Sequence, residues 1–259
     1  MKILFISLGC DKNLADSEEM LGLLTGNGHE IVDSEEEADA IVINTCCFIH
    51  DAKEESVNTI LEMAEYKKTG TCKILIVTGC MAQRYKEEIT EEIPEVDAVL
   101  GTTSYGDIVK ALNEAEAGHV FQEFKDINAL PEDSGRRVIT TGGHYGYLKI
   151  AEGCDKHCTY CIIPSLRGKF RSVPEERLLK QAEYMASQGV RELILVAQET
   201  TVYGTDLYGK KALHILLKKL CQIKGIRWIR VLYCYPEEIY DELIQVMKEE
   251  KKICHYLDL

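Results

Sequence analysis

The stretch DAIVINTC, residues 39–46, joins an apolar run to a cysteine. Three similar runs, KILFIS (2–7), KILIVT (73–78) and DAVLG (97–101), lie on either side of it, and helical periodicity follows each run. Strands of a parallel sheet are buried on both faces, so they appear as continuous apolar runs instead of alternating ones. The first part of the chain is therefore expected to form a small doubly wound α/β domain.

The second half repeats the alternation of strands and helices, as a partial (βα) barrel does. Its expected strands are YGYLKIA (145–151), ELILVAQ (192–198), WIRVLYC (228–234) and CHYLDL (254–259). Helices are expected near 14–25, 51–67, 84–93 and 105–117 in the first half, and near 174–187, 212–223 and 237–248 in the second.

Three parts of the chain follow from this pattern. Residues 1–118 form the N-terminal α/β domain, and residues 145–259 form the partial barrel. Residues 119–144 contain ALPEDSGRR and part of TTGGHYG, lack sustained periodicity and are expected to be a linker. The pattern stops at a strand with no covering helix, and such an open edge suggests an incomplete barrel.

The net charge of −13 is concentrated in the first part of the chain. Residues 1–100 contain 8 basic and 21 acidic side chains, which gives −13, whereas residues 101–259 contain 22 of each. An acidic surface repels phosphate backbones and attracts basic partners. The distribution argues against direct binding of nucleic acid by this chain.

The chain of 259 residues contains eleven cysteines. No apolar run approaches the roughly 18 residues that span a membrane, and the apolar start is too short for a secretory signal. In the reducing cytoplasm, where we expect this chain, grouped cysteines indicate metal binding or catalysis more often than disulfides.

Cys10, Cys46 and Cys80, the first triad, each follow an expected strand closely. Ligands of open parallel sheets bind beyond the carboxyl ends of the strands. The pattern therefore predicts one shared metal site, although three unrelated buried cysteines are the simpler alternative, since cysteine is common in protein cores.

Cys154, Cys158 and Cys161, the second triad, form the pattern C-x3-C-x2-C at the start of the barrel-like half. Zinc with His157 as fourth ligand is one interpretation, but structural zinc sites usually join two separated ligand pairs. An iron–sulfur cubane held by three thiolates leaves one iron open for a substrate or cofactor. We therefore favour a cluster at this triad.

These motifs carry a resemblance to a known family. The spacing of the second triad, together with LGCDKN, NTCCFI and VTGCMAQRY, resembles the methylthiotransferases of the radical S-adenosylmethionine superfamily. Within the family, CIIPSLRGKFRS and AQETTVYGTDLYG are most similar to the branch that modifies an aspartate of a ribosomal protein. The family continues with the rest of the barrel and a small β-rich domain, neither of which this sequence contains.

The resemblance implies two [4Fe-4S] clusters and S-adenosylmethionine as cofactors. The cluster on the second triad would bind and cleave S-adenosylmethionine, and the cluster on the first triad would deliver sulfur to the β-carbon of the aspartate. Apart from the six cluster ligands, no catalytic residue is expected. The implied partners are a small-subunit ribosomal protein as substrate and an electron donor such as flavodoxin or ferredoxin, with no membrane involved.

Three further residues are candidates for cofactor binding. Tyr160 lies before the last cysteine of the second triad, where the superfamily places aromatic rings beside the adenine. Gln198 and Glu199 end an expected strand at the active face, within reach of the amino group or ribose of the cofactor. The basic run Arg167, Lys169 and Arg171 is either a carboxylate-binding group or a solvated loop. The remaining cysteines are expected to be structural: Cys47, Cys72, Cys221, Cys234 and Cys254.

Two alternatives remain open from the sequence. A related methylthiotransferase acts on an isopentenylated adenosine of transfer RNA, so a nucleic-acid substrate is the alternative within the family. Outside enzymes, the same cysteines fit an iron–sulfur or zinc protein without turnover.

Overall fold

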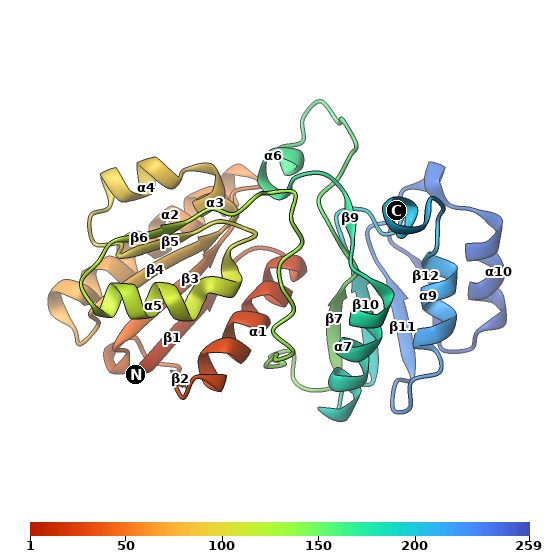
Figure 1. Ribbon diagram of the computed structural model, residues 1–259, viewed down its shortest axis with the longest axis horizontal. Helices are drawn as coiled ribbons and strands as arrows, with labels where there is room; N and C mark the ends of the chain where they lie inside the picture. The colour runs from red at the N-terminus through yellow and green to blue at the C-terminus, as the bar shows by residue number, and fades with distance from the viewer. The chain divides into compact units, whose positions relative to one another are not determined.

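The computed structural model describes residues 1–259 as two compact units (Figure 1). The first unit contains Met1–Val138 and Ser165–Arg167, and the second contains Ile139–Pro164 and Gly168–Leu259. No helix in either unit combines the length and the apolar character that crossing a membrane requires.

The first unit is built on a parallel sheet with the strand order β2-β1-β3-β4-β5-β6. Its strands are β1 (Lys2–Ser7), β2 (Glu30–Val32), β3 (Ala40–Thr45), β4 (Ile74–Gly79), β5 (Ala98–Leu100) and β6 (Phe121–Glu123). The chain moves outward from β1 to β2, then returns past β1 and continues outward from β3. This reversal between β1 and β3 is typical of flavodoxin-like sheets and confirms the expected α/β class.

Helices cover both faces of this sheet (Figure 1). On one face lie α1 (Asp11–Gly26) and α5 (Ile108–Glu116), and on the other lie α2 (His50–Thr69), α3 (Cys80–Arg84) and α4 (Lys86–Glu92). Short 3-10 turns occur at η1 (Glu35–Glu37) and η2 (Tyr105–Asp107). The helix expected near 84–93 corresponds to α4, and α3 is a separate short helix before it, because the backbone leaves helical geometry at Tyr85.

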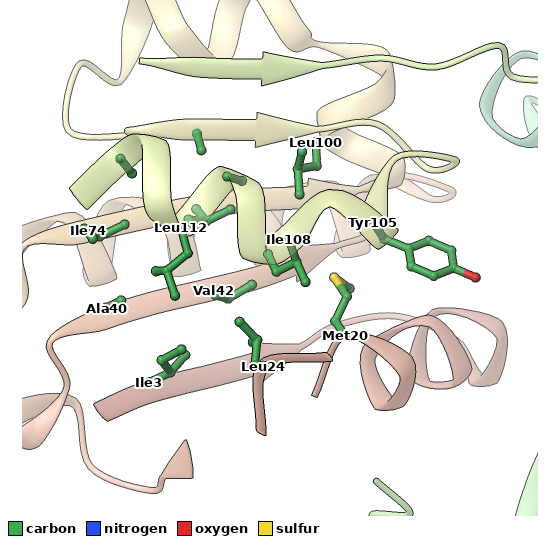
Figure 2. Close-up of a cluster of buried hydrophobic side chains, with 14 residues drawn as sticks. Ile3, Met20, Leu24, Ala40, Val42, Ile74, Leu100, Tyr105, Ile108 and Leu112 are labelled. Carbon is green, nitrogen blue, oxygen red and sulfur yellow. The ribbon is translucent and has the colours of Figure 1, made fainter. Parts of the chain in front are cut away.

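Apolar side chains between the sheet and the helices α1 and α5 form a core (Figure 2). Ile3 of β1 and Val42 of β3 meet Met20 and Leu24 of α1 and Leu112 of α5, and all five are fully buried. Burying one such side chain stabilises the fold by about 1.5–3 kcal/mol. The core fixes the sheet whose carboxyl edge carries the first triad.

The first unit extends beyond the domain end expected at residue 118. Phe121–Glu123, within the expected linker, pairs with β5 as the sixth strand. Arg137 then forms a buried ion pair with Glu18, at 2.6 Å between Nη2 and Oε2. Neither β2 nor β6 contains a buried residue, so neither forms an apolar run, and a single ion pair leaves no periodic pattern; the sequence therefore predicts neither strand nor this extension.

The second unit contains a parallel sheet with the order β12-β11-β10-β7. Its strands are β7 (Tyr145–Lys149), β10 (Glu192–Val196), β11 (Trp228–Val231) and β12 (Ile253–Leu257). The helical segments of this half of the chain are α6 (Ile163–Arg167), α7 (Glu175–Ser187), α8 (Thr205–Tyr208), α9 (Leu213–Leu220), η3 (Pro236–Glu238) and α10 (Asp241–Glu249). All four strands lie where the sequence predicts them. A small antiparallel pair, β8 (Ala151–Glu152) and β9 (Arg171–Ser172), was not expected.

Candidate metal centres

The first triad lies at the carboxyl edge of the first sheet. Strands β1, β3 and β4 are neighbours in register, so all three end at the same edge. Cys10 directly precedes α1, Cys46 directly follows β3, and Cys80 is the first residue of α3. Cys10 and Cys46 therefore flank the β1/β3 reversal, which is the place where open α/β sheets bind ligands.

A glycine before the thiol lets two of these loops approach their neighbours. Gly9 has φ of 88°, and a Cβ there would lie 2.6 Å from Cβ and 2.9 Å from Sγ of Cys46. Gly79, with φ of 93°, faces the side chain of Asn44 and the backbone of Thr45 too closely for any side chain. The glycines of LGC and TGC thus have a steric reason: they allow the three loops to meet.

Asn13, on the first turns of α1, joins the three loops. Its Nδ2 donates to the carbonyl oxygens of Leu8, at 3.1 Å, and Thr45, at 2.9 Å. Its Oδ1 lies 3.8 Å from Sγ of Cys80 and also accepts from the guanidinium of Arg167. Asn13 is fully buried, and the sequence analysis missed its role although it is the last residue of LGCDKN.

The thiols of the first triad lie close enough to influence one another. Burial raises the pKa of Cys46 and of Cys80, and the neighbouring thiols of the triad raise both further. Ser56 of α2 holds Cys46 in place, since its Oγ accepts from the backbone N–H of Cys46 at 3.0 Å and donates to its carbonyl at 2.7 Å. A metal that binds here must displace the thiol protons, so binding releases protons.

The second triad lies in the loop that leaves β8 and returns at β9. The backbone N–H of Cys154 donates to the carbonyl of Gly168 at 3.1 Å, so the two arms of the loop run side by side. Gly153, at φ of 73°, faces the carbonyls of Gly168 and Lys169 too closely for a side chain. Cys154 is buried, whereas Cys158 and Cys161 are half-buried.

Backbone N–H groups and neighbouring side chains shape this loop. The N–H of Lys156 donates to Sγ of Cys154 at 3.4 Å, and the N–H of Cys161 donates to the carbonyl of Cys158 at 3.0 Å. Burial raises the pKa of Cys154, and the thiols of Cys158 and Cys161 raise it further, so the three lie near one another. The Lys156 ammonium lies 2.8 Å from the carboxylate of Glu238 and thereby ties the loop to η3.

The candidate cofactor residues differ in their surroundings. Glu199 is 1 % exposed, contacts Thr201 and lies 3.7 Å from the Lys156 ammonium. Its Oε2 and the Oε1 of Gln198 are buried without a hydrogen-bond partner, so both can accept from a ligand. Tyr160, in contrast, is 85 % exposed, and the structure does not pack its ring into a pocket.

The donor atoms of both triads fit an iron–sulfur cluster. No group of three or more Cys, His, Asp and Glu side chains is arranged to hold a single metal ion, and His157 is exposed. Three thiolates that hold a cubane bind three different irons, so they need not converge on one point. Three thiols from three loops at the carboxyl edge of the first sheet, and three from the single loop between β8 and β9, match the ligand type and number that two such clusters require.

The other cysteines lie within packed structure. Cys47 is buried beside the first triad, and burial raises its pKa to about 12, while Arg84 opposes the rise. Cys72, Cys221 and Cys234 are buried, and Cys254 is half-buried in β12. Their structural role stays a prediction.

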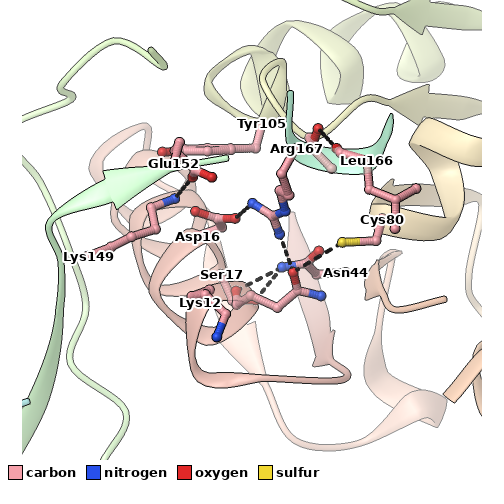
Figure 3. Close-up of polar contacts among 12 residues, drawn as sticks. Lys12, Asp16, Ser17, Asn44, Cys80, Tyr105, Lys149, Glu152, Leu166 and Arg167 are labelled. Atoms are coloured by element: carbon pink, nitrogen blue, oxygen red, sulfur yellow. Dashed lines mark hydrogen bonds and ion pairs between the residues drawn. The ribbon is translucent and has the colours of Figure 1, made fainter. Parts of the chain in front are cut away.

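The basic run contains one residue that is not solvated. Arg167 is 3 % exposed, and its Nη1 donates to Oδ2 of Asp16 at 2.8 Å (Figure 3). Of the two alternatives for the basic run, the solvated loop does not hold for Arg167, because its guanidinium binds the carboxylate of Asp16 inside the first unit. Lys169, by comparison, is exposed.

The comparisons with known proteins agree with the two units. Residues 2–101 match the family described as Uncharacterized protein family UPF0004, and residues 148–259 match the Radical SAM superfamily. The solved structure of the radical S-adenosylmethionine methyltransferase TsrM from Kitasatospora setae covers 97% of this chain and 57% of its own, at a TM-score of 0.63 and 11% identity. At that identity the likeness shows the fold alone.

Curated relatives match the whole chain. The ribosomal protein uS12 methylthiotransferase RimO of Lachnoclostridium phytofermentans is 67% identical over 100% of this chain and 59% of its own length. RimO of Clostridioides difficile is 52% identical over 100% of this chain and 58% of its own. The chain thus spans somewhat less than three fifths of these relatives. The second half of the chain thus matches the Radical SAM superfamily, and the chain is similar along its entire length to methylthiotransferases.

Proposed function

We propose that this chain provides the cluster-binding part of an enzyme that inserts a methylthio group at the β-carbon of an aspartate in ribosomal protein uS12. The observation that carries the proposal is the presence of two separate thiol triads, each in glycine-shaped loops at the edge of its own sheet. The names of the RimO relatives support uS12 as the substrate.

Each triad has a separate role in the proposal. When bound, two [4Fe-4S] clusters and S-adenosylmethionine supply the radical that removes hydrogen from carbon and the sulfur that replaces it. Cys154, Cys158 and Cys161 hold the cluster that keeps one iron open for S-adenosylmethionine, and the first triad holds the other. The six thiolates are the chain's whole proposed catalytic contribution.

Residues near the second triad would orient S-adenosylmethionine. Oε1 of Gln198 and Oε2 of Glu199, which make no hydrogen bond, would accept from its amino group or ribose hydroxyls. The Glu199 carboxylate raises the pKa of Cys154 as a secondary cause after burial, which indicates that it lies near the loop. Tyr160 would cover the adenine, and its exposed ring is free to turn toward a bound cofactor.

Partners and location follow from the same proposal. Flavodoxin or ferredoxin supplies the electron that cleavage requires, and the reaction takes place in the cytoplasm, where ribosomal proteins are made. The proposed functional parts of the chain are an N-terminal domain (1–118), a linker (119–144) and a barrel part (145–259).

Anaerobic reconstitution with iron and sulfide, followed by iron counting, tests the cofactor assignment. Two cubanes give about eight irons per chain, whereas one zinc ion per chain contradicts the proposal. Mass spectrometry tests the substrate: cells that lack the full-length enzyme should contain uS12 without the methylthio group. If transfer RNA nucleosides lose the modification and uS12 does not change, the substrate is RNA.

A further inference from the structure

A buried cation lies beside the thiols of the first triad. Arg167, at the end of α6, belongs to the first unit and pairs with Asp16 of α1 (Figure 3). Its second amino group donates to Oδ1 of Asn13, which lies 3.8 Å from Sγ of Cys80. The guanidinium, the amide and the thiol thus form one chain of contacts.

The guanidinium acts on two cysteines of the triad. Burial raises the pKa of Cys80 most, while Arg167 lowers it through its charge and a hydrogen bond. Arg167 also lowers the pKa of Cys46 through its charge, against the larger effect of burial. Independently of these shifts, the guanidinium contacts the same Asn13 oxygen that lies 3.8 Å from Sγ of Cys80, so a fixed positive charge lies beside the thiol that would hold a cluster.

Stability alone is a weak reason for such a group. Removing an arginine and a carboxylate from water costs several kcal/mol per ion, and an apolar pair of similar size is often as stable. The first unit contains a second buried pair, in which Nε and Nη2 of Arg137 both donate to Oε2 of Glu18. The unit thus provides one buried arginine that contacts Asn13 beside Cys80 and a second buried arginine that is paired with a different carboxylate.

We propose that Arg167 raises the reduction potential of the cluster held by Cys10, Cys46 and Cys80, and that Asp16 limits this effect. The inference rests on the proposed function, since it requires a cluster at this triad. Adding an electron makes a cluster more negative, so a nearby fixed cation stabilises the reduced form. Arg167 is a positioning residue with an electrostatic effect, because it supplies no ligand and touches no substrate.

The proposal predicts shifts of opposite sign in two variants. Arg167→Gln removes the cation and should move the potential to more negative values, with a change in the reduction equilibrium of about tenfold, or about 59 mV for one electron. Asp16→Asn removes the opposing anion and should move the potential to more positive values. Arg167→Lys, which keeps the charge, should stay nearer to the starting chain than Arg167→Gln does.

The measurement is a redox titration followed by electron paramagnetic resonance, after anaerobic reconstitution and iron counting. All variants are made in a chain that also carries Cys154→Ala, Cys158→Ala and Cys161→Ala, so only the first triad contributes a signal. Arg137→Gln is the matched control: it breaks a comparably buried ion pair in the same unit and should leave the potential unchanged.

Each outcome decides the proposal. Opposite shifts in the Arg167→Gln and Asp16→Asn variants, with no shift in Arg137→Gln, support it. An unchanged potential in Arg167→Gln with full iron content overturns it, and so does a shift of equal size in Arg137→Gln. If Arg167→Gln does not fold, the absence of a positive shift in Asp16→Asn overturns it. A parent chain that takes up no iron at the first triad contradicts the proposed function itself, and the inference falls with it.

Discussion

At the scale of single residues, three features hold the first triad in place. Glycines remove the Cβ atoms that would separate the loops, Asn13 bridges their backbones, and Ser56 fixes both backbone groups of Cys46. None of these residues is a proposed ligand. The arrangement fixes the positions of the three cysteine-bearing loops through the backbone.

Cys158→Ala and Cys46→Ala should separate the proposed roles of the two triads. Without Cys158 the open-iron cluster lacks a ligand, so the chain should lose cleavage of S-adenosylmethionine. Cys46→Ala should retain cleavage and lose about half of the bound iron. Chromatography of deoxyadenosine and iron counting measure both effects. Cys72→Ala, which removes a buried thiol outside both triads, is the control; equal cleavage by the two triad variants would refute the assignment.

Asn13→Ala should loosen the loops of the first triad. The change removes both donors to Leu8 and Thr45 and leaves buried acceptors without partners, which costs about 1–3 kcal/mol. Hydrogen exchange in β1 and β3 should therefore become faster, and iron content at this triad should fall. Asn27→Ala, which removes an exposed bond to Leu23, should change stability by less than about 0.5 kcal/mol. Similar exchange in both variants would show that Asn13 is not needed.

At the scale of helices and strands, the sequence predicts the long buried elements best. β3 and β4 are buried at every residue, and continuous apolar runs identify such strands. The three-residue strands β2 and β6 carry no comparable signal, because none of their residues is buried and they form no apolar run.

The same limit applies to the candidate site. The cysteines could be placed at strand ends from sequence, since parallel strands share one carboxyl edge. The burial of Arg167 could not be predicted from the sequence, because its partners Asp16 and Asn13 lie about 150 residues earlier in the chain. A basic run is usually solvated, and only the ion pair of Arg167 with Asp16 of α1 shows that this residue is the exception.

Strand β12 should be the least protected long strand of the two sheets. It forms one edge of the second sheet, and its residues His255 and Tyr256 are exposed, whereas β7 at the other edge has no exposed residue and β3 inside the first sheet is buried at every residue. Edge strands have unpaired backbone groups on one side and open at lower free energy. Native-state hydrogen exchange compares the two strands directly. Equal protection would mean that another chain or a second copy covers the edge of β12.

At the scale of the whole molecule, charge bears on the choice between a protein and an RNA substrate. Residues 1–100 have a net charge of −13, which equals the net charge of the whole chain. Helix α4 contributes four exposed carboxylates to this negative charge: Glu87, Glu88, Glu91 and Glu92. Binding to RNA depends on contacts between basic side chains and phosphates. A basic ribosomal protein, in contrast, is attracted by an acidic surface over distances of about a Debye length.

The association of this chain with purified uS12 should therefore depend strongly on salt. Electrostatic steering raises association rates most at low ionic strength, so the rate constant should fall by about tenfold or more between about 0.05 M and 0.5 M salt. Stopped-flow fluorescence with labelled uS12 measures this. Replacing the four glutamates of α4 by glutamine should lower the rate at low salt and flatten its salt dependence, because the helix keeps its shape and loses its charge. A transfer RNA that associates faster than uS12 under the same conditions would contradict the protein substrate, since this acidic part of the chain should repel it.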